Sequence, residues 1–245
     1  MEGLTDRDPA RIAGMFDAIA RRYDTLNHLL SVGFDRRWRR RAVRELALTG
    51  RERVLDMCTG TADLAIEAVT SAKGGAREVV GIDFAGAMLR IGLAKIRRRS
   101  LDSRIHLARG DATQVPLADA SVDAAMVAFG IRNVVDRARA CREFLRVLRP
   151  GGRLAILEFG MPRLPGLRGL YSGYFRNVLP RIGRLISKHG DAYAYLPASV
   201  GEFPPPHVFA TTLRDTGFVN VRYVPLTFGV VYLYVARRAA SDAWA

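Results

Sequence analysis

The chain has 245 residues, and about half of them are apolar. It is therefore long enough to bury one substantial core, and it falls in the length range of a single α/β domain with additions. No apolar run reaches the roughly 18 residues of a transmembrane helix, and residues 1–8 lack the layout of a secretory signal, so we expect a cytoplasmic protein. Cys58 and Cys141 form no CxxC or Cys/His cluster, which argues against a disulfide framework and against a metal site.

The net charge of +14 comes mainly from arginine. It is concentrated at residues 36–41, where five arginines flank Trp38, and at residues 97–99. Such clusters favour a polyanionic partner, either nucleic acid or an anionic membrane surface. A tryptophan beside the arginines suits a lipid interface as well as a phosphate backbone. The alternative interpretation is an arginine-rich genome composition, with the charges forming an ordinary solvated surface.

Apolar residues at helical spacing predict an amphipathic N-terminal helix over residues 9–31 and a second helix over 35–47, with Trp38, Ala42, Val43 and Leu46 facing inward. Strands and helices then alternate, which predicts a parallel, doubly wound sheet. The expected strands are 52–58, 77–83, 104–109, 121–129 and 152–159, and the helices between them are 62–72, 86–99 and 136–148. Residues 149–152 (RPGG) form the turn that ends the last of these helices at its pre-proline residue. These elements are followed by a helical insertion over 160–205, a helix over 206–216 and strands 219–226 and 229–237. The last strand is expected to run antiparallel.

The turns after the first three strands carry candidate ligand-binding residues. Residues 54–63 run from a buried strand containing Asp56 into a small-residue turn with Gly60 and Thr61, where backbone N–H groups can approach a nucleotide-like ligand. Asp83 ends the next strand and can accept hydrogen bonds from a ribose diol. Asp111 and Ala112 follow the third strand, where they can offer a carboxylate and an N–H group to an adenine edge.

Two alternatives remain for these turns. Asp83 could be the N-cap of the helix that follows it, and Asp111 could cap a short helix near Thr113. Dinucleotide oxidoreductases share the glycine-rich turn and the acidic residue after the second strand. The closing helix and two consecutive strands, however, resemble the seven-stranded fold of class I S-adenosylmethionine-dependent methyltransferases.

Four longer segments resemble the UbiE/MenG family of quinone C-methyltransferases. They are residues 15–27 (MFDAIARRYDTLN), residues 30–38 (LSVGFDRRW), residues 129–134 (FGIRNV), and the insertion with LPRIG at 179–183 and YAYLPASV at 193–200. The resemblance spans about residues 14–235. It implies a single α/β methyltransferase domain over 1–245, with an N-terminal helical cap (about 9–48), a cofactor-binding core (about 50–159), a substrate-side insertion (about 160–205) and a closing helix and strands (about 206–237).

The resemblance implies methyl transfer from S-adenosyl-L-methionine to a ring carbon of a polyprenylated quinol. Demethylmenaquinol is the expected acceptor, and a benzoquinol of ubiquinone biosynthesis is the alternative. A quinol carbon is a weak nucleophile unless a ring hydroxyl shares or loses its proton, so the site needs a hydrogen-bonding group near that oxygen. The resemblance places Tyr23, Arg132 and Asn133 around the acceptor. Arg132 could instead form an ion pair with Asp136 or Asp24, and Tyr23 could be a core aromatic residue.

A polyprenylated quinol resides in the bilayer, so the resemblance also implies peripheral contact with the inner face of the cell membrane, through the first helix and the arginines near Trp38. The aromatic residues of the insertion, Tyr171, Tyr174, Phe175, Tyr193 and Tyr195, are expected to line or cover a substrate channel. No nucleic-acid partner is expected, because no RNA-binding module or base-amino methyltransferase motif occurs. A nucleic-acid methyltransferase and a non-catalytic scaffold remain alternatives, and the oligomeric state, a homodimer included, stays open.

Three positions depart from the family pattern. Ala62 stands in the glycine-rich turn at a position where glycine is common in the family. The substitution adds a methyl group near the cofactor, and a helix can still begin at this turn. Ala128 replaces a small hydroxyl residue, so one side-chain hydrogen bond to the cofactor is unavailable. Tyr232 and Tyr234 stand where the family has a small residue and a histidine, and these tyrosines are expected to reshape the quinone pocket.

Overall fold

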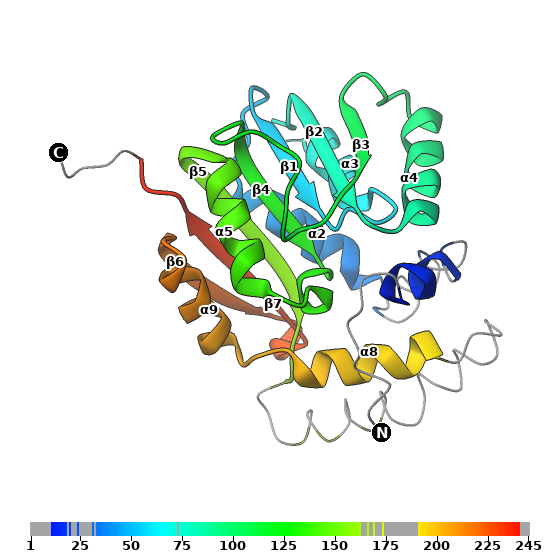
Figure 1. Ribbon diagram of the computed structural model, residues 1–245, viewed down its shortest axis with the longest axis vertical. Coiled ribbons are helices and arrows are strands. Elements are labelled where there is room, and N and C mark those ends of the chain that lie inside the picture. The colour runs from blue at the N-terminus through cyan, green and yellow to red at the C-terminus, as the bar shows by residue number, and fades with distance from the viewer. Residues whose placement is uncertain are drawn as a thin grey trace.

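The computed structural model describes residues 11–18, 20, 24, 31, 33–72, 74–162, 166, 169, 173 and 191–240. A seven-stranded sheet with the order β3-β2-β1-β4-β5-β7-β6 forms its centre. The first five strands in the chain run parallel, whereas β7 pairs antiparallel with both β5 and β6. The predicted seven-stranded α/β fold with an antiparallel closing strand is therefore confirmed (Figure 1).

The elements alternate along the chain as the hydrophobic periods predict. The strands are β1 (Arg53–Met57), β2 (Glu78–Asp83), β3 (Ile105–Arg109), β4 (Val122–Ala128), β5 (Leu148–Phe159), β6 (Val219–Leu226) and β7 (Val231–Arg237). The α-helices are α2 (Phe34–Glu45), α3 (Asp63–Thr70), α4 (Gly86–Arg98), α5 (Arg137–Val147), α8 (Asp191–Glu202) and α9 (Pro206–Asp215). The short 3₁₀ turn η1 (Ile131–Asn133) follows β4, and a second one, η3 (Thr227–Gly229), precedes β7.

Helices cover both faces of the sheet, and each face has its own hydrophobic core. One core joins α2, α3 and Ile96 of α4 to strand residues such as Val54 and Val79. The opposite core joins α5 and α9 to the alternate strand residues, such as Leu55 and Val80. Because successive strand side chains point to opposite faces, each apolar central strand supplies both cores.

The largest difference from the predicted boundaries is the start of β5. The RPGG segment was expected to form a turn before a strand at residue 152, but β5 begins at Leu148, directly after α5. Leu148 pairs with Val122, and the register then shifts before Ala124 pairs with Arg153. The extra residues form an irregularity in the strand, with Gly151 at φ 77°, a conformation that glycine adopts without strain. At the other end of the chain, Ser31 lies in a turn and not in the predicted N-terminal helix.

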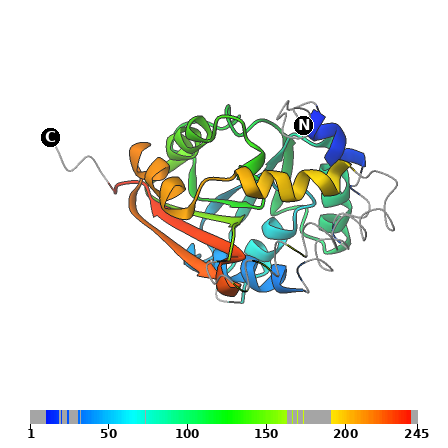
Figure 2. The same ribbon diagram turned by 90° about the horizontal axis from the view of Figure 1, so that it is seen from below.

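Two helical segments lie at the carboxyl edge of the parallel strands. Figures 1 and 2 show α8 crossing this edge, with the helical residues 11–18 beside it. Asp17 accepts a hydrogen bond from the N–H group of Ala87 at 2.7 Å, and Ala20 packs against Ala85 and Met88. The N-terminal segment is thereby fixed against the start of α4. Among the residues described, no helix combines the length and the apolar character that a bilayer span requires.

Trp38 belongs to the core and not to a lipid-facing surface. Its side chain is 5% exposed, packs edge-on against Phe129 and Phe159, and donates a hydrogen bond from Nε1 to Thr227 Oγ1 at 2.9 Å. The inward orientation predicted for Trp38 is correct, but the suggested role of this ring at a membrane interface is wrong. A buried indole with its N–H group paired is a packing residue.

Candidate functional site

The turn after β1 is built for close approach of a ligand. Cys58, Gly60 and Ala62 all have positive φ, at 57°, 54° and 64°. The N–H group of Ala62 bonds to the carbonyl of Thr59 at 2.9 Å, which closes the turn and directs the chain into α3. Only glycine adopts this backbone region freely, so Cys58 and Ala62 hold it at a cost of about 1–2 kcal/mol each. The turn therefore keeps its conformation although Ala62 stands where glycine is common in the family pattern.

Asp83 connects the two turns that end β1 and β2. Its carboxylate accepts hydrogen bonds from the N–H group of Gly60 at 2.9 Å and from the N–H group of Ala85 at 2.8 Å. The second bond is the contact that the N-cap alternative predicted, although Ala85 itself occupies the N-cap position of α4. Burial raises the pKa of Asp83, and the hydrogen bonds from Ala85 and Gly60 oppose this shift. Asp83 thus fixes the glycine-rich turn, and its remaining lone pairs can accept from a diol.

Asp111 and Ala112 line a cavity of about 200 Å³ beside these turns. Asp111 is exposed, and its Oδ1 accepts a hydrogen bond from the N–H group of Thr113 at 2.8 Å. No helix follows, so the alternative of a helix cap is wrong, and Asp111 instead closes a turn through a bridge to Gln114. The other lining residues are mainly apolar: Ile12, Met57, Cys58, Phe84, Asn133, Val134, Val135, Asp136, Arg139 and the adjoining Thr113. A flat apolar ring with a polar edge suits such a cavity.

Asp56 lies beneath the turn and is not exposed to the cavity. Its side chain is buried, and Oδ2 accepts a hydrogen bond from Thr59 Oγ1 at 2.6 Å. Within the described part of the chain, Oδ1 has no hydrogen-bond partner. Burial raises the pKa of Asp56 to about 7, against the opposing effect of the Thr59 hydroxyl. Asp56 therefore supports the turn through Thr59, and its predicted contact with a cofactor stays a prediction.

The turn after β4 touches the turn after β1 at Gly130. A Cβ atom on Gly130 would lie 2.3 Å from Cys58 Cβ and 2.9 Å from Cys58 Sγ, closer than real Cβ atoms approach any neighbour. Glycine is thus required at this position as long as Cys58 keeps its side chain. Burial, together with Asp83 and Asp56, raises the pKa of Cys58 well above its usual value, so the thiol stays protonated.

Arg132 is held in a buried ion pair with Glu158 of β5. Arg132 Nη1 lies 2.9 Å from Glu158 Oε1, and the exposed fractions of the two side chains are 4% and 0%. Glu158 Oε2 also accepts from the N–H group of Arg132 at 3.1 Å. The alternative partners Asp136 and Asp24 are therefore wrong. The guanidinium further contacts the carbonyl of Phe129 and, at 3.3 Å through Nε, Ser199 Oγ of α8.

Asn133 and Tyr195 join the same turn to α8. Asn133 Oδ1 accepts a hydrogen bond from the Tyr195 hydroxyl at 3.1 Å, and both side chains are buried. Asn133 also lines the cavity that contains Asp111. Arg132 and Asn133 are thus each bonded to one residue of α8, a contact between the FGIRN turn and the insertion that the sequence did not predict.

Several expected site residues fall outside the described residues: Tyr23, Tyr171, Tyr174 and Phe175, as well as the side chain of Tyr193. Thr61 is described, and its hydroxyl donates to Asp24 Oδ1 at 2.6 Å and accepts from Lys95 Nζ at 2.9 Å. A contact of Thr61 with a cofactor would therefore use its backbone.

The closing tyrosines do not line the cavity. Tyr232 and Tyr234 are 2% and 1% exposed and belong to the core beneath α9, where the Tyr234 ring stands edge-on to Phe209. They therefore do not shape this cavity, and the expectation that they reshape a quinone pocket stays a prediction. In a sheet covered by helices on both faces, each strand residue faces one of two hydrophobic cores. The sequence alone does not show whether such a residue packs inside that core or lines a cavity at its edge.

Sequence reasoning missed two residues that organise the site. Glu158 is a single carboxylate within the buried run of β5, and such a residue needs a paired cation, which is the signal that could have identified it. Lys95 bonds to Thr61, Asp24 and Asp63, and thereby links the glycine-rich turn to the N-terminal segment. The only feature of the sequence that could have drawn attention to Lys95 is that lysine is rare in this arginine-rich chain.

The sheet order and the turns at its carboxyl edge define the class I S-adenosylmethionine-dependent methyltransferase fold. Solved structures agree: a methyltransferase from Thermotoga maritima, described as a possible histamine N-methyltransferase, superposes with a TM-score of 0.62 at 18% identity, covering 92% of this chain and 98% of that chain. A putative methyltransferase from Bacillus halodurans gives a TM-score of 0.59 at 17% identity over 81% of this chain and 97% of that chain. These likenesses establish the fold.

The sequence profile of the ubiE/COQ5 methyltransferase family matches residues 4–238, and the chain belongs to that family. A relative from Syntrophotalea carbinolica, the ubiquinone/menaquinone biosynthesis C-methyltransferase UbiE, is 51% identical over 92% of this chain and 93% of its own length. The demethylmenaquinone methyltransferase of Thermus thermophilus is 48% identical over 91% of this chain and its full length. The predicted family and the predicted methyltransferase class are confirmed.

Proposed function

We propose that this protein transfers a methyl group from S-adenosyl-L-methionine to a ring carbon of a polyprenylated quinol, with demethylmenaquinol as the acceptor. The observation that carries the proposal is the near-complete match to relatives named for quinone C-methylation, at 48–51% identity. The geometry supports it, because the cavity adjoins both the glycine-rich turn and Asn133.

The residues at the strand ends fit the cofactor. Asp83 fixes the turn at Gly60 and can accept from the ribose hydroxyls, while Asp111 and the Ala112 N–H group can meet the adenine edge. Because Gly130 carries no Cβ atom, the two turns can lie close together. When bound, S-adenosylmethionine supplies an electrophilic methyl group, whose bond to sulfur breaks as the ring carbon forms its new bond.

The acceptor needs a residue that handles the proton of a ring hydroxyl, and later the ring carbon must lose a proton. We assign the hydroxyl contact to Tyr23 and Asn133. The Asn133 amide is oriented by Tyr195 and can donate to a quinolate oxygen. Arg132 is always protonated and cannot be the base. Its bond to Glu158 makes it a positioning residue that holds the turn carrying Asn133.

We also propose that the protein meets the membrane surface peripherally, because the acceptor's polyprenyl chain resides in the bilayer. The support is electrostatic: Arg36, Arg37, Arg40 and Arg41 are all exposed on α2. A basic helical surface is attracted to anionic lipid by about 1 kcal/mol per charge. Exposed Phe34 stacks beneath Arg37 and adds an apolar contact to the same surface.

The experiment that tests the proposed reaction uses S-adenosylmethionine with a labelled methyl group and short-tailed demethylmenaquinol, kept reduced in detergent. We expect the label in the extracted quinone and equimolar S-adenosylhomocysteine. A parallel reaction with a demethylated benzoquinol distinguishes the two acceptors, and faster transfer to the naphthoquinol supports our assignment. Cofactor binding without S-adenosylhomocysteine formation on either acceptor would contradict it.

A further inference from the structure

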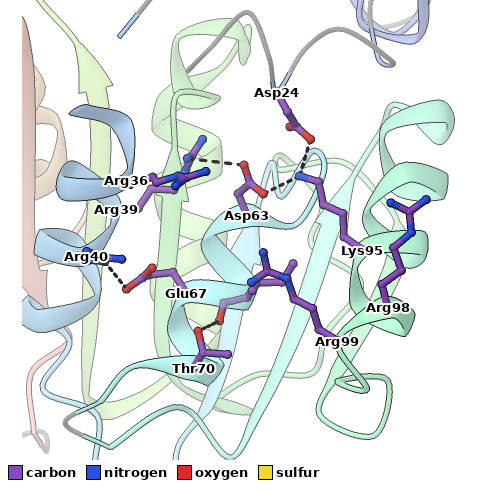
Figure 3. A pocket seen from close by; sticks show the side chains of 11 residues that line it. Asp24, Arg36, Arg39, Arg40, Asp63, Glu67, Thr70, Lys95, Arg98 and Arg99 are labelled. Atoms are coloured by element: carbon purple, nitrogen blue, oxygen red, sulfur yellow. Dashed lines mark hydrogen bonds and ion pairs between the residues drawn. The ribbon is translucent and has the colours of Figure 1, made fainter. Parts of the chain in front are cut away.

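A second cavity, of about 430 Å³, opens on the opposite side of the glycine-rich turn, between α2, α3 and α4. Six cationic side chains line it: Arg36, Arg39 and Arg40 of α2, Lys95 and Arg98 of α4, and Arg99, which directly follows α4. Three acidic side chains, Asp24, Asp63 and Glu67, line it as well. The cations therefore exceed the acids by three charges. Figure 3 shows how these side chains surround one space.

The acids of this cavity are already neutralised by half of the cations. Lys95 Nζ lies 2.6 Å from Asp24 Oδ2 and 2.5 Å from Asp63 Oδ1. Arg40 Nε lies 3.5 Å from Glu67 Oε1. Arg39 is buried, with Nη1 at 2.5 Å from Asp35 and 3.6 Å from Asp63. No carboxylate in the lining remains without a cation.

The other three cations are exposed and lack such a partner. Across the residues that the structure describes, Arg36, Arg98 and Arg99 form no ion pair with a carboxylate, although they face the same cavity. Like charges gathered in one space repel each other, and a bound anion relieves this repulsion. Guanidinium groups bind tetrahedral oxyanions through paired N–H donors.

The lining also indicates what kind of anion fits. Ile66 is the only residue of the lining with a hydrocarbon side chain, so the cavity does not suit an isoprenoid or acyl chain. Its volume exceeds that of a single phosphate and accommodates two phosphate groups or one phosphate with a polar substituent. Asp35 lies outside the lining but pairs with Arg39, so the surplus around the cavity is two positive charges. This surplus matches a phosphomonoester and neutralises most of the charge of a diphosphate.

We propose that this cavity is a phosphate-binding site, which takes a diphosphate or a phosphomonoester through Arg36, Arg98 and Arg99. It is separate from the cavity that contains Asp111 and Asn133, and it does not depend on which acceptor is methylated. The phosphate can belong to a soluble phosphoanion or to the head group of an anionic lipid. The site adjoins the glycine-rich turn, because Lys95 bonds to Thr61 at 2.9 Å.

Calorimetric titration of the full chain with inorganic pyrophosphate tests the site. We expect saturable binding at one site and, because a charge-assisted hydrogen bond is removed, at least about tenfold weaker binding in Arg99→Ser. Arg97→Ser is the matched control, because Arg97 is exposed in the last turn of α4, two residues before Arg99, and is not part of the lining. Equal weakening by Arg97→Ser would overturn the proposal, as would absence of saturable pyrophosphate binding together with absence of the vesicle capture described next.

Two further measurements complete the test. Thermal unfolding and S-adenosylhomocysteine binding show whether each variant is folded, and Arg36→Ser replaces Arg99→Ser if the latter is not. Sedimentation with phosphatidylcholine vesicles, with and without phosphatidate, then distinguishes the source of the phosphate. Phosphatidate-dependent capture that Arg99→Ser loses and Arg97→Ser keeps assigns the site to a lipid head group. Pyrophosphate binding without that capture assigns it to a soluble phosphoanion, and failure of both refutes the site.

Discussion

Replacing Glu158 by glutamine is expected to destabilise the fold by about 3 kcal/mol, because breaking a buried ion pair leaves a buried charge without its counterion. The Glu158 carboxylate accepts from Arg132 Nη1 at 2.9 Å, from the Arg132 N–H group at 3.1 Å and from the Phe159 N–H group at 2.8 Å. Glutamine keeps one acceptor oxygen but removes the negative charge and turns the second acceptor into a donor.

Urea unfolding, analysed by linear extrapolation, measures this change. At about 2–4 °C per kcal/mol for a protein of this size, a loss of about 3 kcal/mol corresponds to a Tm lower by roughly 10 °C. Glu78→Gln is the matched control, because its 3.4 Å pair with Arg53 is partly exposed and worth less than about 1 kcal/mol. The reasoning is refuted if Glu158→Gln changes the unfolding free energy no more than Glu78→Gln does.

Three further changes test the turns at the strand ends. Gly130→Ala should destabilise by about 1–3 kcal/mol through its clash with Cys58 Cβ at 2.3 Å. The double variant with Cys58→Gly, measured in the same urea unfolding, should recover most of the loss, and no recovery would contradict the clash. Asp56 has a pKa of about 7 in the fold, above that of the unfolded chain, so stability should fall as pH rises from about 4 to 7, by at most about 1.4 kcal/mol per pH unit. Asp56→Asn should lack this slope in unfolding curves between about pH 4 and 7, and an unchanged slope would assign it to other groups. Asp83→Ala should weaken S-adenosylhomocysteine binding at least about tenfold in calorimetry, whereas a change at exposed Asp102 should have no effect; equal effects would exclude a specific role of Asp83.

The order of strands and helices could be predicted because the helices repeat apolar residues at a period near 3.6, whereas the central strands are short, nearly continuous apolar runs bounded by turn residues. Trp38 shows the same logic for a single side chain, since its helical spacing with Ala42 placed it inward, as found. The start of β5 could not be predicted, because Pro150 and Gly151 are typical of a turn. Here the pairing of Leu148 with Val122 keeps the irregular residues within the strand.

For the site, the positions of Asp83 and Asp111 followed from the rule that ligands bind at the carboxyl ends of parallel strands. The partner of Arg132 did not follow, because Glu158 is 26 residues away in the sequence and lies close only once β4 and β5 have paired. Local acidic residues, such as Asp136, were the obvious candidates from sequence alone. Contacts between distant segments depend on sheet register, which is set by packing of the whole core.

The central claim is methyl transfer to carbon, and carbon-13 NMR of the reaction product tests it most directly. The reaction contains S-adenosylmethionine with a carbon-13 methyl group, reduced demethylmenaquinol and either the natural protein or Asp83→Ala. We predict a methyl signal bonded to a ring carbon, formed by the natural protein and strongly reduced in Asp83→Ala. A methyl signal bonded to oxygen, or no methylated quinone although S-adenosylhomocysteine still binds, would contradict the account.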